Sequence, residues 1–244
     1  MVSDELAGKV ALVTGAGSGL GAATARAFAA AGGAVACLDV NEEAARCVSA
    51  GLDGESVALA CDVCDPASVA TAVDAAVARF GRLDVAVNCA GLDHVRPVTE
   101  LTVEQWDQIL GVNLRGPFLV ARAAFGVMQR QHSGHIVNIA STAAVRAWAN
   151  ASAYHASKWG LIGFSRGLGV EGREFGIRVT TVIPGGMRTH FFDRFPEQGI
   201  PMPDERNLQD PATVADAILY AIRVPPTSNL QELILTPLTE TSWP

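Results

Sequence analysis

Short apolar runs alternate along the chain with longer stretches in which apolar residues recur at helical spacing. The runs are typical of buried strands, and they cover residues 9–13, 34–38, 56–61, 83–87, 135–139, 178–183 and 232–235. Helical spacing marks residues 22–31, 66–80, 154–175 and 212–222, a segment that begins near residue 42, and a segment from about 103 through 113 to 130. Before 212–222, Asp210 and Pro211 form a predicted helix cap and first-turn pair. Strands that alternate with helices build parallel sheets with helices on both faces. The pattern therefore predicts an α/β fold, a Rossmann-type doubly wound parallel sheet of about seven strands in three α/β/α layers.

One long segment, about residues 186–210, shows neither a strand-like apolar run nor apolar residues at helical spacing. Loops of this length inside compact domains are usually lids or binding loops, and this one carries Phe191, Phe192, Phe195, Met202 and three prolines. We expect it to form an apolar wall over a substrate; the alternative is a surface or interface loop. Since no linker, repeat or low-complexity tract divides the chain, residues 1–244 are predicted to form a single domain.

Composition and charge narrow the classes of function. The chain of 244 residues has a net charge of -7 and a pI near 5.2, which gives no electrostatic footprint for nucleic acid, and no run of Lys and Arg suggests binding to an anionic membrane. The N-terminus lacks the basic and apolar regions of a secretory signal. The five cysteines are an odd number without framework spacing, as expected of reduced thiols in a cytosol-like compartment. We therefore expect a cytoplasmic protein that binds neither nucleic acid nor membrane.

Two of the cysteines, Cys61 and Cys64, form a CxxC pair. A zinc site would need a second pair of ligands, and the sequence supplies none at a suitable spacing. We therefore predict no metal site.

A glycine-rich turn joins the first strand to the first helix. Residues 14–21 read Thr-Gly-Ala-Gly-Ser-Gly-Leu-Gly, in the strand-to-helix context that a dinucleotide-binding turn requires. Glycines let the backbone approach a pyrophosphate, whose charge is favoured by the free amides and the dipole of a helix N-terminus. The turn predicts a dinucleotide cofactor held by Gly15, Ser18, Gly19, Leu20 and Gly21; the alternative is a plain strand-to-helix turn.

Asp39 ends the second strand, 18 residues after Gly21. A carboxylate there can accept hydrogen bonds from both adenosine ribose hydroxyls and would repel a 2′-phosphate. The next residues, Val40-Asn41-Glu42, contain no Arg or Lys that could bind such a phosphate. The cofactor is therefore predicted to be NAD rather than NADP, with Asp39 and Val40 beside the ribose. The alternative is that Asp39 only caps the helix that begins near Glu42.

Two further strand ends are predicted to face the cofactor. Asp62 and Val63 follow the third strand, where they would meet the adenine. After the fourth strand, residues 88–91 form a turn of small residues that would let the backbone pass beside the cofactor, with contacts from Asn88, Ala90 and Gly91. Asn88 could also tie neighbouring strands together. The alternative, a structural turn, is compatible with contact between this turn and the cofactor.

The predicted chemical centre combines Ser141, which follows the fifth strand, with Tyr154 and Lys158. Tyr154 and Lys158 are four residues apart, so both project from one face of a helix. A phenol with a pKa of about 10 is a poor base at neutral pH, but a neighbouring cation can lower that pKa by roughly 1 to 3 pH units. Tyr154 could then exchange a proton with an alcohol or carbonyl while Ser141 hydrogen-bonds the same oxygen. Taken alone, the spacing describes an ordinary surface tyrosine more often than a catalytic pair.

Asn113 is polar among apolar neighbours in a predicted helix. A mid-helix amide needs partners, so it either bonds nearby backbone or holds a water molecule. The sequence leaves both possibilities open.

Along essentially its whole length the chain resembles the short-chain dehydrogenase/reductase family. The turn from Thr14 to Gly21 is similar to the family's TGxxxGxG, and Asn88 to Gly91 resemble its NNAG, with Cys89 in place of the second Asn. The family's catalytic set is matched by Asn113, Ser141, Tyr154 and Lys158, and its nicotinamide-side PGxxxT by Pro184, Gly185 and Thr189.

The resemblance implies a role for each of these residues. Tyr154 would be the general acid/base, Lys158 would bind the nicotinamide ribose and lower the tyrosine's pKa, and Ser141 would orient the substrate oxygen. Asn113 would hold a proton-relay water. Thr189 and the backbone near Met187 would hold the nicotinamide carboxamide, beside Pro184 and Gly185.

The substrate is expected in an apolar pocket beside this centre, because such a pocket flanks the matching motifs. Its predicted lining consists of Leu92, His94, Ala143, Trp148, Asn150, Gly185, Met187, Phe191 and Phe192. These residues include no cluster of cationic side chains that would bind the carboxylate or phosphate group of a substrate. We expect an NAD-dependent oxidoreductase of secondary alcohols and ketones, with oxidation the favoured direction because the cellular NAD pool is generally oxidised.

Two other functions stay open. An NADPH-dependent carbonyl or 3-oxoacyl reductase would differ in its cofactor, and a non-catalytic NAD-binding regulator would need none of Ser141, Tyr154 and Lys158. The resemblance also implies a homo-oligomer, a dimer or homotetramer, with the helices around 115–131 and 154–175 at an interface. The ending from Leu233 to Pro244 lacks the glycine-rich, aspartate-containing form of many members and is more similar to the subset that ends in a strand plus Pro-x-Thr. The resemblance therefore does not imply the geometry of the oligomer or a contact of a partner's tail with the substrate.

Overall fold

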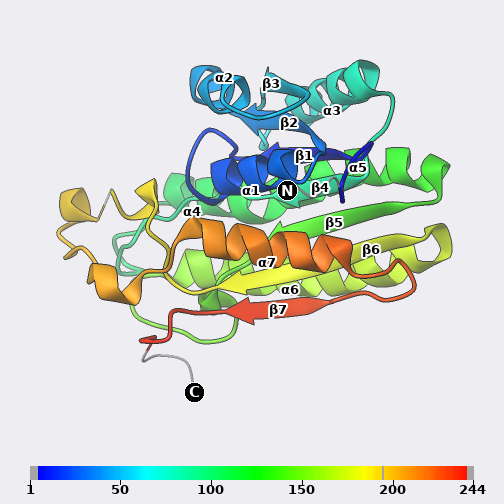
Figure 1. Cartoon of the computed structure of the whole chain (residues 1–244). Helices are drawn as coiled ribbons and strands as arrows, with labels where there is room; N and C mark the ends of the chain where they lie inside the picture. The colour runs from blue at the N-terminus through cyan, green and yellow to red at the C-terminus, as the bar shows by residue number, and fades with distance from the viewer. Residues whose placement is uncertain (1–4, 194, 241–244) are drawn as a thin grey trace.

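A single parallel sheet forms the centre of the molecule (Figure 1). In the computed structural model, which describes residues 5–193 and 195–240, this sheet has seven strands in the order β3-β2-β1-β4-β5-β6-β7. The strands are β1 Val10–Thr14, β2 Ala34–Asp39, β3 Ser56–Ala60, β4 Val85–Asn88, β5 Gly134–Ile139, β6 Ile177–Pro184 and β7 Glu232–Leu235. The order reverses between β1 and β4, so the predicted doubly wound Rossmann-type sheet is confirmed.

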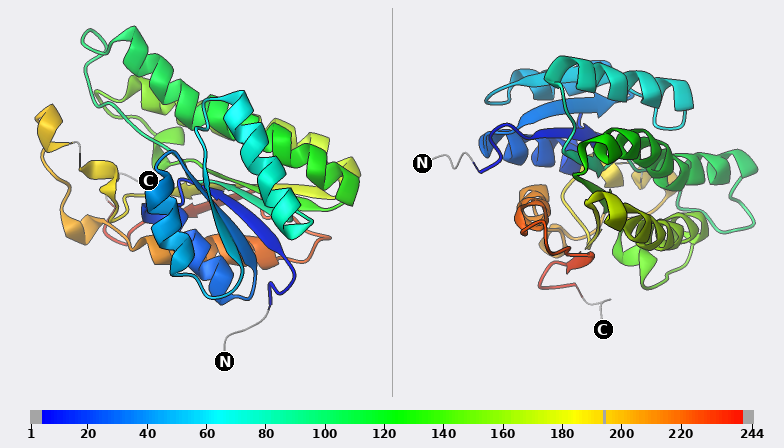
Figure 2. Two further views of the ribbon diagram at one scale, coloured as in Figure 1. Left: turned by 90° about the horizontal axis from the view of Figure 1, so that it is seen from above. Right: turned by 90° about the vertical axis from the view of Figure 1, so that its right-hand side faces the viewer.

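Helices cover both faces of the sheet (Figure 2). One face packs against α1 (Gly19–Ala30), α2 (Glu42–Ala50) and α7 (Pro211–Arg223). The other packs against α3 (Pro66–Phe80), α5 (Gly116–Gln131) and α6 (Ser152–Gly172), with α4 (Val103–Leu110) beside α6. The three predicted layers are therefore present.

The strands supply apolar side chains to both of these faces. Along β1, Ala11 and Val13 belong to the core under α1 and α7, whereas Val10 and Leu12 belong to the core under α3 and α5. Successive side chains of a strand point to opposite faces, so a strand buried on both sides is apolar at most of its positions. This explains why the strands appear in the sequence as mainly apolar runs.

One predicted helix is interrupted, and the N-terminal cap of another excludes an alternative role for Asp39. The helix expected from about 103 to 130 is interrupted by a π-helical turn, Gly111–Arg115, between α4 and α5. The helix α2 is capped by Asn41, whose side chain accepts from the N–H of Ala44. Asp39 therefore does not cap this helix, and that alternative is wrong. The predicted start of α7, a capping Asp210 followed by Pro211, is confirmed.

The predictions for the ends of the chain are only partly covered. Residues 1–4 and 241–244 lie outside the described residues, and the latter are the last four positions of the unusual ending. Among the described residues, no helix combines the length and the apolar character needed to cross a membrane.

His135, on β5, has a buried imidazole with one unpartnered nitrogen. Its Nε2 lies 2.7 Å from the Thr180 hydroxyl oxygen, and that hydroxyl donates to the carbonyl of Leu230 over 2.6 Å, so Nε2–H must be the donor to Thr180. Nδ1 is buried and has no hydrogen-bond partner. A proton on Nδ1 would carry its charge into this enclosed space, so burial lowers the pKa of His135 from 6.5 to about 3, and the nearby Arg178 adds to the effect.

We therefore expect stability to fall at mildly acidic pH. The unfolded imidazole gains a proton as the pH falls through 6.5, whereas the folded one stays neutral until about 3, so this stabilisation is complete above pH 6.5 and is lost progressively below it. From pH 6.5 to about 4.5 the free energy of unfolding should drop by about 2 to 3 kcal/mol. Urea unfolding across this range should show a much flatter pH dependence in His135→Gln, whose amide can still donate to Thr180. An unchanged dependence would show that His135 is not its source.

Candidate active site

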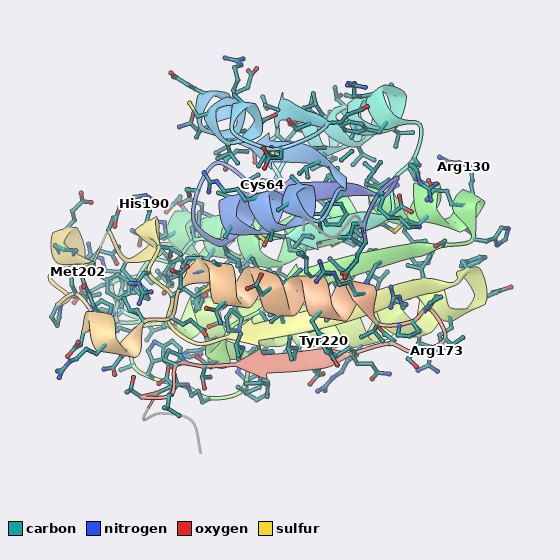
Figure 3. The ribbon with its side chains drawn as sticks, viewed as in Figure 1. Cys64, Arg130, Arg173, His190, Met202 and Tyr220 are labelled. Atoms are coloured by element: carbon teal, nitrogen blue, oxygen red, sulfur yellow. The ribbon has the colours of Figure 1, made fainter. Side chains whose placement is uncertain are left out.

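A cavity of about 1830 Å³ lies at the carboxyl ends of the strands, where residues that follow β1 to β6 meet. It is larger than the roughly 300–1,000 Å³ typical of a single small-molecule site, so a dinucleotide and a substrate can fit side by side. His190 and Met202 lie at this end of the molecule, and Arg130 and Arg173 lie at the opposite end (Figure 3).

The long loop after β6 closes one side of the cavity. It contains three short 3-10 turns, His190–Phe192, Pro196–Gln198 and Glu205–Asn207, where no regular structure was predicted. The aromatic rings of Phe191, Phe192 and Phe195 line the cavity and stack edge to face along the loop, with ring centroids 5.5 Å and 5.1 Å apart. The loop therefore forms an apolar side of the cavity, and its role as a wall over a substrate stays a prediction.

The glycine turn leads into a helix whose N-terminus is not capped. Ser18, the N-cap of α1, makes no side-chain capping bond, whereas α2, α3, α4 and α7 each begin with a side chain that accepts a first-turn N–H. The turn is also tightly closed, because a Cβ on Gly21 would lie 2.1 Å from the carbonyl oxygen of Gly15. Free N–H groups at a helix N-terminus on the cavity wall fit a pyrophosphate.

Asp39 lies beside this turn. Its carboxylate accepts hydrogen bonds from the backbone N–H groups of Gly17 and Asn41, both over 2.9 Å. These bonds fix the carboxylate on the cavity wall, and its remaining lone pairs are available to hydroxyl donors. The position fits a ribose that donates two hydroxyls.

Tyr154 and Lys158 lie one turn apart on α6, and both line the cavity with Ser141. The Ser141 side chain is a hydrogen-bond partner of the Tyr154 phenol, and it also accepts from the N–H of Ala143 over 3.1 Å, which fixes its orientation. Lys158 donates to the carbonyl of Ile139 over 2.8 Å, and its Nζ lies 5.6 Å from the centre of the Tyr154 ring. The three predicted residues therefore come together around one point of the cavity.

The protein alone does not show the expected effect of Lys158 on Tyr154. Burial raises the pKa of the phenol above its ordinary value; the hydrogen bond from Ser141 opposes this rise only in part, and Lys158 is not among the groups that shift it. The ammonium is itself buried, which lowers the pKa of Lys158 to about 8. For the phenol and the ammonium alike, loss of surrounding water has a larger effect on the pKa than the mutual attraction that their helical spacing suggested.

Asn113 lies in the π-helical turn and is fully buried. Its Oδ1 accepts from the N–H of Leu92 over 2.9 Å, and its Nδ2 donates to the carbonyl of Leu92 over 2.8 Å and to the Ser157 hydroxyl over 3.2 Å. The amide thus bonds the backbone of a residue 21 positions earlier. Asn113 does not line the cavity, and its role in holding a relay water stays a prediction.

Most of the other predicted site residues reach the cavity wall. Those that line it are Gly15, Ser18, Gly19, Leu20, Gly21, Val40, Asp62, Val63, Ala90, Gly91, Leu92, Trp148, Asn150, Pro184, Gly185, Met187 and Thr189.

Besides Asn113, three predicted residues do not line the cavity. Asn88 is buried in the sheet, where its Nδ2 donates to Asn138 over 2.8 Å, so it ties β4 to β5 as expected but lies away from the cofactor space. Ala143 is fully buried, and the His94 ring turns toward Gln108, 2.7 Å away. A motif predicts which residues are near a site, but side-chain direction depends on the tertiary packing.

The cavity also has wall residues that the sequence did not suggest. Asp93 lines it immediately after Leu92. Arg146 lines it as well, and its guanidinium contacts Thr142 and Glu240, each over 3.2 Å. Charged residues in loops are usually solvated, so only the folded chain distinguishes these two.

His155 supports the same wall from behind. Its Nδ1 lies 2.8 Å from the carbonyl oxygen of Ala143, so it carries the proton, and its Nε2 accepts from the N–H of Trp148 over 3.1 Å. It thereby holds the segment from 143 to 148 against the start of α6. In the sequence, only its position next to Tyr154 indicates that His155 lies near the site.

The CxxC pair lies on the cavity wall beside Asp62 and Val63 and shows no sign of thiol reactivity. Burial raises the pKa of Cys61 to about 11 and also raises that of Cys64, whereas a reactive thiol requires a lowered pKa. Among the described residues, no group of three His, Cys, Asp or Glu side chains could hold a metal ion.

Comparison with known proteins places this site in a known context. A family model described as short chain dehydrogenase matches residues 9–199. A D-threitol dehydrogenase of Mycolicibacterium smegmatis is 47% identical over 182 residues, which cover 73% of this chain and 70% of that protein. A levodione reductase of Leifsonia aquatica is 38% identical over 187 residues, covering 74% and 70% of the two chains.

Solved structures resemble the whole fold. A crystal structure of levodione reductase matches with a TM-score of 0.90 at 28% identity and covers 98% of this chain and 100% of its own. An alcohol dehydrogenase of the archaeon Thermococcus sibiricus, complexed with 5-hydroxy-NADP, matches with a TM-score of 0.83 at 26% identity, covering 94% and 97%.

Proposed function

The chain belongs to the short-chain dehydrogenase family, and we propose that it oxidises a secondary alcohol to a ketone with NAD, Tyr154 being the general base. The family uses NAD or NADP for alcohol and ketone oxidoreduction. The observation that carries the proposal is the meeting of Ser141, Tyr154 and Lys158 on the wall of a cavity that the uncapped end of α1 also faces.

The residues around the phenol suggest how the proton moves. Ser141 would donate a hydrogen bond to the alcohol oxygen and hold it beside Tyr154, whose phenolate would accept the hydroxyl proton. Lys158 would bind the ribose next to the nicotinamide. When bound, NAD supplies the acceptor for the hydride that leaves the carbinol carbon, and Gly15, Gly19 and Gly21 would hold its pyrophosphate. The products are the ketone, NADH and the proton on Tyr154.

The preference for NAD over NADP rests on Asp39. Its carboxylate lies 2.9 Å from the Gly17 N–H at the edge of the cavity, where a 2′-phosphate would meet a like charge. The exposed Val40 beside it offers no positive group. The alcohol dehydrogenase structure with 5-hydroxy-NADP belongs to another protein and leaves the alternative, an NADPH-dependent carbonyl or 3-oxoacyl reductase, open to a direct test.

We also propose a homo-oligomer that packs through α6. Trp159 and Val170 on this helix are 55% and 58% exposed, which is unusual for large apolar side chains in a monomer. Gly163 and Gly167 lie between them on the same helical face, and a Cβ on either would meet nothing within 4 Å. A smooth apolar stripe of this kind suits close packing against the same helix of a second copy.

For the chain as a whole we propose one domain that carries both cofactor and substrate, with residues 186–210 as the substrate wall. The names of the relatives, a dehydrogenase of D-threitol and a reductase of levodione, support a small alcohol or ketone as the substrate class.

The proposal predicts NADH formation when the purified protein is mixed with NAD and small secondary alcohols. A panel of mono-, di- and polyhydric alcohols of three to six carbons, followed by NADH absorbance, would test it. A non-catalytic NAD-binding regulator would bind NAD in calorimetry and give no NADH with any alcohol. Turnover of the alcohols with NADP and not with NAD would instead support the reductase alternative.

A further inference from the structure

The segment after β4, residues 92–96, is a rigid part of the cavity wall. Asn113 holds its first residue through both backbone polar groups of Leu92, over 2.9 Å and 2.8 Å. Because Asn113 is fully buried and also bonds Ser157, this clamp ties the segment to the helix that carries Tyr154. The position of the next residue, Asp93, is therefore set relative to the chemical centre.

The rest of the segment is bonded to three other parts of the chain. The His94 ring is hydrogen-bonded to a side chain of α4. The backbone N–H of Val95 donates to a side chain of the long loop after β6, and the backbone N–H of Arg96 donates to the backbone just before α6. The partners are Gln108 Oε1 at 2.7 Å from His94 Nε2, Gln198 Oε1 at 2.8 Å from Val95 N, and the Asn150 carbonyl at 2.8 Å from Arg96 N. A segment held at so many points cannot easily turn Asp93 away from the cavity.

Asp93 itself lines the cavity, and its carboxylate is only partly satisfied, because the backbone N–H of His94 donates a hydrogen bond to it. Its Oδ1 is buried without a hydrogen-bond partner. The side chain makes no ion pair of 4 Å or less with any of the described residues; the nearby Lys158 donates instead to the Ile139 carbonyl. An acceptor left in this state destabilises the empty site, and a donor from a bound molecule would offset that cost.

The carboxylate is also close to the reacting centre. Its charge acts on both Lys158 and Tyr154, raising the pKa of each, and Lys158 acts on it in return. Burial raises the pKa of Asp93 to about 7, which agrees with a site that few water molecules reach. A group that binds Asp93 therefore lies a short distance along the substrate from the carbon whose hydroxyl meets Tyr154.

We propose that Asp93 is a specificity-determining residue that accepts a hydrogen bond from a second hydroxyl group of the substrate, so that the enzyme selects vicinal diols and longer polyols. The inference rests on the proposed alcohol oxidation and adds the substrate class to it. A substrate with one hydroxyl group would bury the carboxylate further and give it no donor, and sites built to hydrogen-bond a hydroxyl reject analogues that lack it.

The test compares four-carbon alcohols that differ in their number of hydroxyl groups: butan-2-ol, butane-2,3-diol and threitol. With NAD, wild-type kcat/KM should be higher for the diol or the tetrol than for butan-2-ol by about 10²-fold. Asp93→Ala should lower kcat/KM for the preferred polyol by about 10²-fold and leave that for butan-2-ol within about threefold. Asp93→Asn keeps an acceptor oxygen and should lie between them.

Asp74→Ala, at an exposed position of α3, is the matched control and should leave all rates unchanged. Equal losses of kcat/KM for mono- and polyhydric alcohols in Asp93→Ala would assign a structural role to Asp93 and overturn the inference. Wild-type turnover without preference for a second hydroxyl would overturn it as well, while leaving the proposed oxidation intact. No NADH from any of the alcohols would overturn the proposed function and this inference together.

Discussion

Replacing Tyr154 by Phe is expected to lower kcat for alcohol oxidation by about 10³-fold, the scale of lost general base catalysis. The exchange removes only the hydroxyl. The ring of Tyr154 packs against Ala143 and Ala151 and lies 5.7 Å from the ring of Phe191, and Phe preserves these contacts. We therefore expect the unfolding temperature and the affinity for NAD, measured by calorimetry, to stay close to those of the wild type.

Tyr220 offers a matched control, because it is the chain's other tyrosine. It lies on α7 and is 63% exposed, away from the cavity (Figure 3). Tyr220→Phe is expected to leave kcat unchanged. Normal turnover in Tyr154→Phe would end the assignment of Tyr154 as the base.

The pH dependence of alcohol oxidation should reflect the titration of Tyr154 as the general base. Since burial raises the pKa of Tyr154, the fraction of phenolate grows as the pH rises toward that pKa. The kcat/KM for oxidation is expected to increase from about pH 6 to about pH 9 in the wild type. A rate independent of pH across this range would contradict a base with a raised pKa.

Replacing Asp39 by Asn is expected to change the ratio of kcat/KM for NAD to that for NADP by about 10²-fold in favour of NADP. The amide keeps an acceptor oxygen for the N–H of Gly17, so the variant removes the charge and largely preserves the turn. Loss of the charge weakens hydrogen bonds from the ribose hydroxyls and relieves repulsion of a 2′-phosphate, so the two effects act in the same direction.

The control for this variant is Asp53→Asn, at an exposed loop position. It should leave the ratio of the two cofactors unchanged. If the wild type already prefers NADPH to NADH, or if Asp39→Asn leaves the ratio unaltered, Asp39 does not select the cofactor.

The fold followed from the sequence because its determinants are local. The doubly buried strand that contains Leu12 and Val13 needs an unbroken apolar run, and the start of α7 needs only Asp210 and Pro211. The glycine turn and the spacing of Tyr154 and Lys158 are local in the same sense.

What the sequence did not predict depends on residues far apart in the chain. The partner of Asn113 is Leu92, 21 positions away, and no local pattern links them. The pKa of Tyr154 depends on how much water the folded cavity excludes, which helical spacing does not report. No pattern in the sequence singles out Asp93, whereas the hydrogen bonds of its neighbours in the folded chain fix it on the cavity wall.

The central claim is that this site transfers hydride from the carbinol carbon of a secondary alcohol to NAD. Incubation of the wild-type protein with NAD and an alcohol substrate deuterated at that carbon tests it most directly, with the nicotinamide product and the ketone analysed by mass spectrometry. We predict reduced cofactor that carries one deuterium, together with an equal amount of ketone, and neither product from Tyr154→Phe at comparable times. Reduced cofactor without deuterium, or no reduced cofactor from any alcohol that the protein binds, would contradict the claim.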